Sequence, residues 1–299
     1  MKRIIIIPIL MFSLLFLVSC GTEEASTGAA NGAFIGGAQG IVAVFEPFGV
    51  EEDNTFTIFD TETFPMELTI ANKGEYEIKA NDVTIELKGP SLDFSGIAAL
   101  SKSNSGVVGI VSELLPDGEE ETITFATDAK YDQDVNGYID REWFANIEYN
   151  YETYVVMPDV CLKGDLKDDR ICEVDGAKTY FVSGAPISVT AVEESTAGKG
   201  IMALKITVQD QGTGKVTLPT EDFGTQEKIA YSIDDNDWEC KQGGKLNEAR
   251  LIEGKADIIC KLKVALGEDD LATKQLKLTL DYKYRDIIQE SIRIKESDK

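Results

Sequence analysis

Apolar and polar residues alternate along several short runs of this chain, and this period of two is the strongest constraint on its fold. Successive side chains of a β-strand point to opposite faces, so each run predicts a strand with one buried face. No comparable helical pattern competes, and Gly, Asn and Asp separate the runs, as in antiparallel sheets. The sequence therefore predicts an all-β fold, with its clearest strands at 66–70, 83–88, 122–125, 202–208 and 276–284.

Two short motifs occur twice, at nearly equal separations along the chain. A Met-x-Leu-x-Ile strand that leads into Asn-Lys-Gly at 66–74 recurs as Met-x-Leu-x-Ile before Asp-Gln-Gly at 202–212. A Tyr-x-Tyr pair at 149–151 recurs at 282–284. Such spacing indicates two copies of one module, each of the size of a usual single-core domain.

The domain organisation that follows is two tandem antiparallel β-sandwich domains. We expect the first over 40–162 and the second over 185–295, joined by a polar, Asp-rich linker at 163–184 and followed by a short tail at 296–299. The preceding segment, 20–39, consists mostly of Gly, Ala, Ser and Thr, a composition typical of a flexible linker.

The first module resembles a known family. It has a strand that ends in Asn-x-Gly (68–74), a second strand (83–87), and a Leu-Pro-x-Gly-Glu turn (115–119) before a Thr-rich strand (122–125). This order resembles the CARDB module, a cell-adhesion-related, Ig-like domain of archaeal and bacterial surface proteins. The resemblance covers roughly 64–125, and the second module matches more loosely. It implies an Ig-like β-sandwich and a surface role, and it implies no catalytic residues.

The N-terminus has the layout of an export signal, which we place at 1–19. A basic start precedes an apolar run over 4–18, and this run is shorter than the roughly 20 residues that cross a bilayer as a helix. The sequence Leu-Val-Ser-Cys at 17–20 resembles the lipobox of prokaryotic lipoproteins, in which the cysteine after the cut carries the lipid. We therefore expect Cys20 to anchor the protein to the outer face of the cell membrane. Cleavage elsewhere, with a secreted product, is the alternative.

The remaining cysteines predict two disulfides. Setting Cys20 aside leaves an even number, which in an exported chain indicates a disulfide framework. Of the possible connectivities, the local one joins Cys161 to Cys172 and Cys240 to Cys260. A zinc site of cysteines is the weaker interpretation, because no close Cys-x-x-Cys pair is present.

Composition excludes several functions. The net charge of −24 would repel nucleic acids and anionic lipid surfaces, so no nucleic-acid partner is expected. Histidine is absent from the sequence, which removes Ser-His-Asp and Cys-His catalysis and histidine metal ligands. Chemistry based on two carboxylates remains, as in glycoside hydrolysis. With 53 acidic residues, however, a facing pair would have little meaning.

One segment resembles a calcium loop. Residues 132–140 place oxygen ligands at alternate positions with Gly at the sixth, as in EF-hands and dockerins, but the twelfth position is Trp143 instead of a bidentate Glu. An Asp-rich, solvated turn between strands is the alternative. The candidate Ca²⁺ ligands are Asp132, Asp134, Asn136, the carbonyl of Tyr138, and Asp140.

Together these features predict a non-enzymatic, surface-anchored lipoprotein. Its two Ig-like modules would serve adhesion, protein–protein interaction or spacing, with other envelope or surface proteins as partners and no required cofactor apart from possible Ca²⁺. A glycan- or substrate-binding lipoprotein is one alternative, and it needs exposed rings such as Trp143 and neighbouring tyrosines. A carboxylate-dependent hydrolase is another, and it needs a cleft that holds two acids.

Overall fold

The computed structural model of this chain describes residues 34–168 and 170–297. Within these ranges no α-helix occurs, and the helical element is a 3-10 turn at Ser91–Asp93. The strands form several sheets whose pairings are antiparallel, apart from a parallel contact between β3 and β20. The predicted all-β class is confirmed. The predicted signal peptide and Cys20 lie outside the described residues, and in the described ranges no helix is long and apolar enough to cross a membrane.

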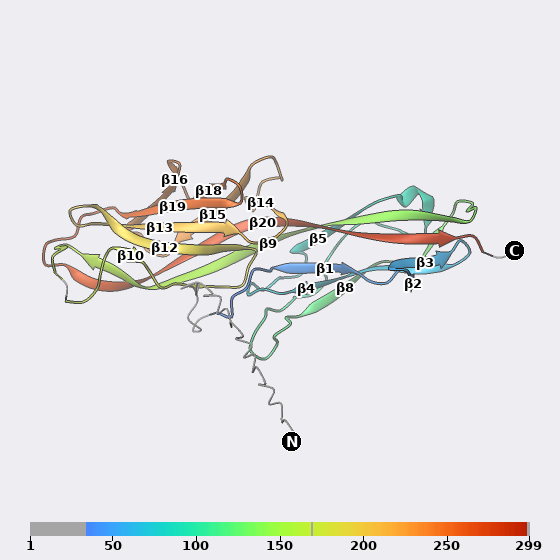
Figure 1. The fold of residues 1–299 in the computed structure, drawn as a ribbon, viewed down its shortest axis with the longest axis horizontal. Coiled ribbons are helices and arrows are strands. Elements are labelled where there is room, and N and C mark those ends of the chain that lie inside the picture. Colours follow the sequence, from blue (N-terminus) through green and yellow to red (C-terminus); the bar gives the residue numbers. More distant parts are fainter. Residues whose placement is uncertain (1–33, 169, 298–299) are drawn as a thin grey trace, which may run out of the picture.

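The strands gather into two lobes (Figure 1). The N-terminal lobe holds β1 (Ile41–Phe45), β2 (Val50–Glu52), β3 (Thr55–Phe59), β4 (Thr63–Asn72), β5 (Val83–Lys88), β6 (Phe94–Ser95), β7 (Ser101–Ser103) and β8 (Glu120–Tyr131). The C-terminal lobe holds β10 (Gly176–Ala177), β11 (Phe181–Val182), β12 (Ile187–Gly198), β13 (Ile201–Asp210), β14 (Lys215–Thr217), β15 (Glu227–Ile233), β16 (Trp238–Gln242), β17 (Lys245–Leu246), β18 (Glu248–Leu251) and β19 (Lys255–Leu262). Two long strands, β9 (Tyr138–Lys163) and β20 (Leu271–Lys295), run through both lobes.

Each lobe has a sheet of its own, and both lobes share a third. The N-terminal sheet has the order β1-β4-β8-β6, and the C-terminal sheet has the order β10-β12-β13-β19-β16-β17. The shared sheet has the order β18-β15-β20-β9-β5-β7 along its main path. In the N-terminal lobe, Phe94 of β6 packs on Trp143 of β9, with ring centroids 5.5 Å apart, so the two sheets enclose a core.

The antiparallel pair β9 and β20, which we call the ribbon, connects the lobes. Its pairing extends from Leu271 opposite Lys163 to Lys295 opposite Tyr138, with one register shift after Lys274. The first half of β9 pairs with β5 in the N-terminal lobe, whereas the first half of β20 pairs with β15 in the C-terminal lobe. The N-terminal lobe therefore contains the second half of β20, and the C-terminal lobe contains the second half of β9, so the lobes exchange half-strands. The predicted boundaries at 40–162 and 185–295 do not describe this exchange.

Both predicted disulfides are confirmed. Cys161 at the end of β9 is joined to Cys172, and Cys240 and Cys260 are joined where they lie opposite each other on β16 and β19. Next to the first disulfide, the buried carboxylate of Glu194 accepts hydrogen bonds from the Cys161 amide. Two disulfides are consistent with a protein that folds outside the cytoplasm.

The end of β20 tests whether the N-terminal lobe needs this exchanged strand. Ile292 and Ile294 are fully buried and pair with β3 on one side and β9 on the other. We expect truncation after Ser291 to lower the free energy of unfolding by about 4 kcal/mol or more, since deleting one buried aliphatic side chain typically costs roughly 2–5 kcal/mol. Urea denaturation followed by circular dichroism measures this.

The matched control is truncation after Ser297, which keeps both isoleucines and the hydrogen bonds of Glu296 and Ser297 with Gly137 and Asp60. It should change stability by less than about 0.5 kcal/mol, as surface changes usually do. Equal unfolding midpoints for the two truncations would contradict a structural role for the exchanged strand.

Candidate functional site at the junction of the lobes

Four buried tyrosines of the ribbon mark the place where the lobes meet. Tyr149 lies opposite Tyr284, and Tyr151 lies opposite Tyr282, so strand alternation places all four rings on one face. Neighbouring ring centroids are 5.8 to 6.4 Å apart, within the range of favourable aromatic contacts. Burial raises the pKa of Tyr149 and of Tyr282 well above the ordinary value, so their hydroxyls stay protonated. We call this group the tyrosine quartet.

On the N-terminal side, Tyr151 closes a turn that begins at Asn72. The Tyr151 hydroxyl donates to Asn72 Oδ1 at 3.2 Å and accepts the backbone N–H of Tyr76 at 3.3 Å. Asn72 Oδ1 also accepts the Gly74 amide, while its Nδ2 donates to the carbonyls of Tyr76 and Val108. Glycine is required at 74, because a Cβ there would lie 2.1 Å from the Tyr151 hydroxyl. The fully buried Asn72 side chain is thus satisfied at both ends.

On the C-terminal side, Tyr284 closes an equivalent turn that begins at Asp210. The Tyr284 hydroxyl donates to Asp210 Oδ1 at 3.1 Å and accepts the Gly214 amide at 2.9 Å. Asp210 Oδ1 also accepts the Gly212 amide at 2.9 Å, and a Cβ at Gly212 would lie 2.2 Å from the Tyr284 hydroxyl. The repeated sequence motifs therefore occupy equivalent positions, with an amide at one turn and a carboxyl at the other.

The carboxyl of Asp210 has an unusually high pKa. Burial raises its pKa to about 6, with a further increase from the nearby carboxylates Glu227 and Asp286, against hydrogen bonds from Gly212 and Tyr284 that lower it. Asn72 at the equivalent position does not titrate. The junction thus has one neutral turn and one that ionises slightly below neutral pH.

The start of the described chain is fixed at the same junction. The Glu75 carboxylate accepts the amides of Ile35 and Gly36, each at 2.9 Å, and the amide of Gly184 at 2.7 Å. The Ala185 amide in turn donates to the Gly37 carbonyl. Glu75 therefore ties the N-terminal segment to the loop between β11 and β12 of the C-terminal lobe. Sequence reasoning missed this role, because an isolated Glu in an acidic chain carries no local signal.

A cavity of about 200 Å³ opens beside the tyrosine quartet. It is smaller than the roughly 300–1,000 Å³ typical of small-molecule sites. Its lining includes Gln39, Tyr149, Pro186, Gln211, Tyr284 and Asp286.

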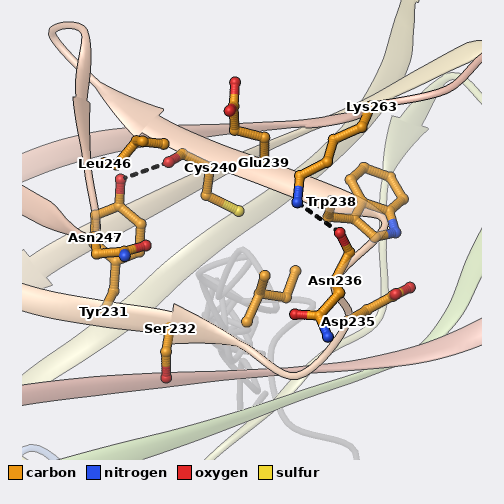
Figure 2. A pocket seen from close by; sticks show the side chains of 11 residues that line it. Tyr231, Ser232, Asp235, Asn236, Trp238, Glu239, Cys240, Leu246, Asn247 and Lys263 are labelled. Atoms are coloured by element: carbon orange, nitrogen blue, oxygen red, sulfur yellow. Dashed lines mark hydrogen bonds between the residues drawn. The ribbon is translucent and has the colours of Figure 1, made fainter.

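A larger pocket of about 340 Å³ lies in the C-terminal lobe (Figure 2). Several of its polar groups bond to one another. The Tyr231 hydroxyl donates to the Cys240 carbonyl at 3.2 Å, and Lys263 Nζ donates to the Asn236 carbonyl at 2.7 Å. Trp238 is 3% exposed, so its ring is part of the core.

The two carboxylates of this pocket do not form a catalytic pair. Figure 2 shows Asp235 and Glu239 pointing away from each other. Lys274 lies 2.6 Å from the Asp235 carboxylate, and Lys241 lies 2.6 Å from that of Glu239. Partial burial raises the pKa of Asp235, but the bonds from Lys274 and from the backbone outweigh it, and Lys241 lowers the pKa of Glu239. A glycosidase acid needs the opposite shift.

The aromatic residues considered for glycan stacking are inaccessible. Trp143 and the tyrosine quartet are each at most 2% exposed. They therefore offer no ring face to a sugar, and the glycan-binding alternative loses the observation that suggested it.

The candidate calcium ligands lie at the turn between β8 and β9. Asp132 accepts a hydrogen bond from Ser95 Oγ at 2.8 Å, and Asp140 is bound by the Arg293 guanidinium at 2.7 and 3.0 Å. Arg293 lowers the pKa of Asp140 through this bond. In the part of the chain that the structure describes, no group of three or more Cys, Asp or Glu side chains is arranged to hold a metal ion. Asp134, Asn136 and Tyr138 are exposed.

Comparison with known proteins identifies no family. No protein-family model matches this chain, and no curated protein sequence matches it. Among solved structures, the secreted serine protease VesC from Vibrio cholerae matches with 11% identity over 83% of this chain, at a TM-score of 0.22. The match spans 51% of the protease chain, and at this TM-score it carries no argument about fold or activity.

The reciprocal substitutions Asp210→Asn and Asn72→Asp test the two turns. Because folding raises the pKa of Asp210, the folded state holds its proton more tightly, and wild-type stability should fall as pH rises from about 4 to about 6. Asp210→Asn removes this loss. We expect it to stabilise the protein by about 1 kcal/mol above pH 6, after allowing for solvent screening of a partly exposed group, and to match wild type below about pH 4.

Asn72→Asp should act in the opposite direction, since it places a carboxylate beside two buried carbonyls. Thermal melts of the three proteins across this pH range give the comparison. A wild-type protein whose stability does not change between pH 4 and 6 relative to Asp210→Asn would contradict the assignment.

A calcium titration tests the turn at 132–140. Because Asp140 is already paired with Arg293, we expect the melting temperature to stay unchanged on adding millimolar calcium or a chelator. The double variant Asp132→Ala/Asp134→Ala should melt like its parent in both conditions. A calcium-dependent increase that this variant lacks would establish a site.

Proposed function

We propose that this protein is a non-enzymatic lipoprotein, anchored through Cys20 to the outer face of the cell membrane. It presents two Ig-like β-sandwich modules to other envelope or surface proteins for adhesion or contact. The observation that carries the proposal is the position of residues 34–40. They lie at the junction between the lobes, where Glu75 binds the amides of Ile35 and Gly36 and the Gly40 carbonyl accepts the Lys73 amide. An anchor upstream of them would hold the molecule at its middle.

The ribbon supports a display role because it makes the two lobes one stiff unit. At about 3.4 Å per residue, a strand of the length of β9 spans roughly 85 Å. Bending the lobes against each other would break hydrogen bonds between β9 and β20 at the tyrosine quartet. The exchanged strands therefore favour a fixed arrangement of both modules.

Attachment at the middle favours contact over spacing. A spacer places a functional end far from the membrane and is best anchored at its opposite end. Here residues 34–40 lie between the two lobes, so both ends of the molecule stay free (Figure 1). Among the roles considered, adhesion or protein–protein interaction agrees best with this geometry.

A non-enzymatic role is supported by the chemistry available. Histidine is absent from the sequence, and the carboxylates of the pocket in Figure 2 are paired with lysines. The acidic surface of a chain with net charge −24 further favours a partner with basic or neutral contact groups.

The substitution Cys20→Ser tests the anchor. We expect the variant to move from the membrane fraction to the soluble fraction and to lose incorporation of labelled fatty acid, because the acylated thiol is gone. Thr22→Ser, two residues downstream, is the matched control and should stay in the membrane. Retention of Cys20→Ser in the membrane fraction would contradict the anchor.

The same variant separates display from catalysis in the native organism. If the protein acts by presenting its modules at the surface, soluble Cys20→Ser should fail to restore the adhesion or envelope contacts that are lost on deletion. A soluble enzyme would still reach its substrate. Full restoration by Cys20→Ser would therefore overturn the display role, even where the wild type is membrane-bound.

A further inference from the structure

The loop between β7 and β8 carries a group of exposed apolar side chains. Backbone hydrogen bonds between Ser112 and Leu115, each of 3.0 Å, close a tight turn that leaves Leu114 97% exposed. We define the apolar tip as the four exposed large hydrophobic residues of this loop, which are Val107, Ile110, Leu114 and Leu115. Several large apolar side chains exposed in one loop are a feature typical of contact surfaces.

The apolar tip lies beside the point where the N-terminal segment joins the fold. The Val111 amide donates to the Gly74 carbonyl at 3.0 Å, and the adjoining Glu75 binds the amides of Ile35 and Gly36. Ile35 is itself 50% exposed. Figure 1 shows this loop and the start of the described chain on the same side of the molecule.

We propose that the apolar tip inserts into the surface of the bilayer that holds the Cys20 anchor. This contact fixes which side of the two-lobed molecule faces the membrane. This inference rests on the proposed function. Phe34, the first described residue, follows Cys20 by fourteen residues, a stretch that reaches at most about 50 Å when fully extended. The anchor therefore keeps the junction, and the tip beside it, at high local concentration near the lipid.

Charge defines the class of lipid surface. Glu113 and Asp117 lie on either side of Leu114 and Leu115 in the sequence, and the Asp117 side chain is 91% exposed, with Lys73 3.7 Å away. Carboxylates at this position repel anionic headgroups, so attraction comes from the apolar side chains entering the boundary of the acyl chains. A neutral or zwitterionic surface should bind the tip better than an anionic one.

The experiment introduces a fluorescent reporter at the tip. Leu114→Trp places an indole in the loop, whereas the native Trp143 and Trp238 are buried. Lipidated protein is reconstituted into phosphatidylcholine vesicles with or without brominated acyl chains, which quench an inserted indole. In a second arm, unlipidated mature chain is coupled through the Cys20 thiol to a maleimide lipid, so the tip is tested whether or not cells acylate Cys20.

The matched control is Leu92→Trp. Leu92 is 96% exposed in the 3-10 turn before β6, which pairs with the far end of β8, whereas the tip precedes the start of β8. The length of β8 separates the two sites by about 35 Å.

We expect brominated lipid to lower the additional emission of Leu114→Trp about twofold, as for a side chain buried roughly 5–10 Å into the interface. Emission of Leu92→Trp should not change, and adding phosphatidylglycerol should weaken the quenching of Leu114→Trp. Equal emission of both variants with and without bromine in the coupled arm would overturn the proposal. A blue shift in the emission of Leu114→Trp that appears without vesicles and grows with protein concentration would show that the tip contacts a second copy of the chain. This result would also overturn the proposal.

Discussion

The backbone hydrogen bonding of the ribbon is the interaction on which the rest of the structure depends. A strand edge inside a core must pair its N–H and C=O groups. In the N-terminal lobe, one edge of β9 pairs with the second half of β20, and in the C-terminal lobe, one edge of β20 pairs with the second half of β9. β9 and β20 are thus edge-covering strands for each other. The arrangement removes two long free edges that would otherwise invite pairing with other chains. The tyrosine quartet lies near the middle of this strand pair, where the cores of the two lobes become continuous.

The tyrosine quartet shows how a repeated module changes when its copies are joined. Both turns keep glycine, because the tyrosine hydroxyl occupies the space of a Cβ, and both keep an acceptor oxygen at the first position. The side chain that provides this oxygen differs. Asn72 adds two donors that satisfy buried carbonyls, whereas Asp210 has none to give and lies near other carboxylates. A buried amide can be neutral and fully bonded, and a buried carboxyl must lose either its charge or some stability.

Local pattern predicted much of this molecule, and its limits have physical causes. Period-two alternation identified the strands, the even cysteine count identified the disulfides, and the repeated motifs marked the equivalent turns. The alternation at 276–284 did not predict a strand of the length of β20, because no side chain over 286–291 is buried and the pattern is interrupted there before it returns at Ile292 and Ile294. The exchange of half-strands depends on pairing between residues more than a hundred positions apart, which no local signal records. The same holds for Glu75, whose partners lie in two separate segments.

The proposed anchor at Cys20 would give the exchange of half-strands a functional meaning. Two modules joined by a flexible linker would move independently, and an anchor before the first would leave the second free to move relative to the membrane. The ribbon couples the two modules, and Glu75 holds Ile35 and Gly36 at their junction, so any orientation imposed near the junction is transmitted to both lobes. The proposed contact of the apolar tip with lipid would act next to the junction, where a few side chains would suffice to orient both lobes. Partners would then meet lobe surfaces at a defined height and angle, which lowers the entropy lost on binding.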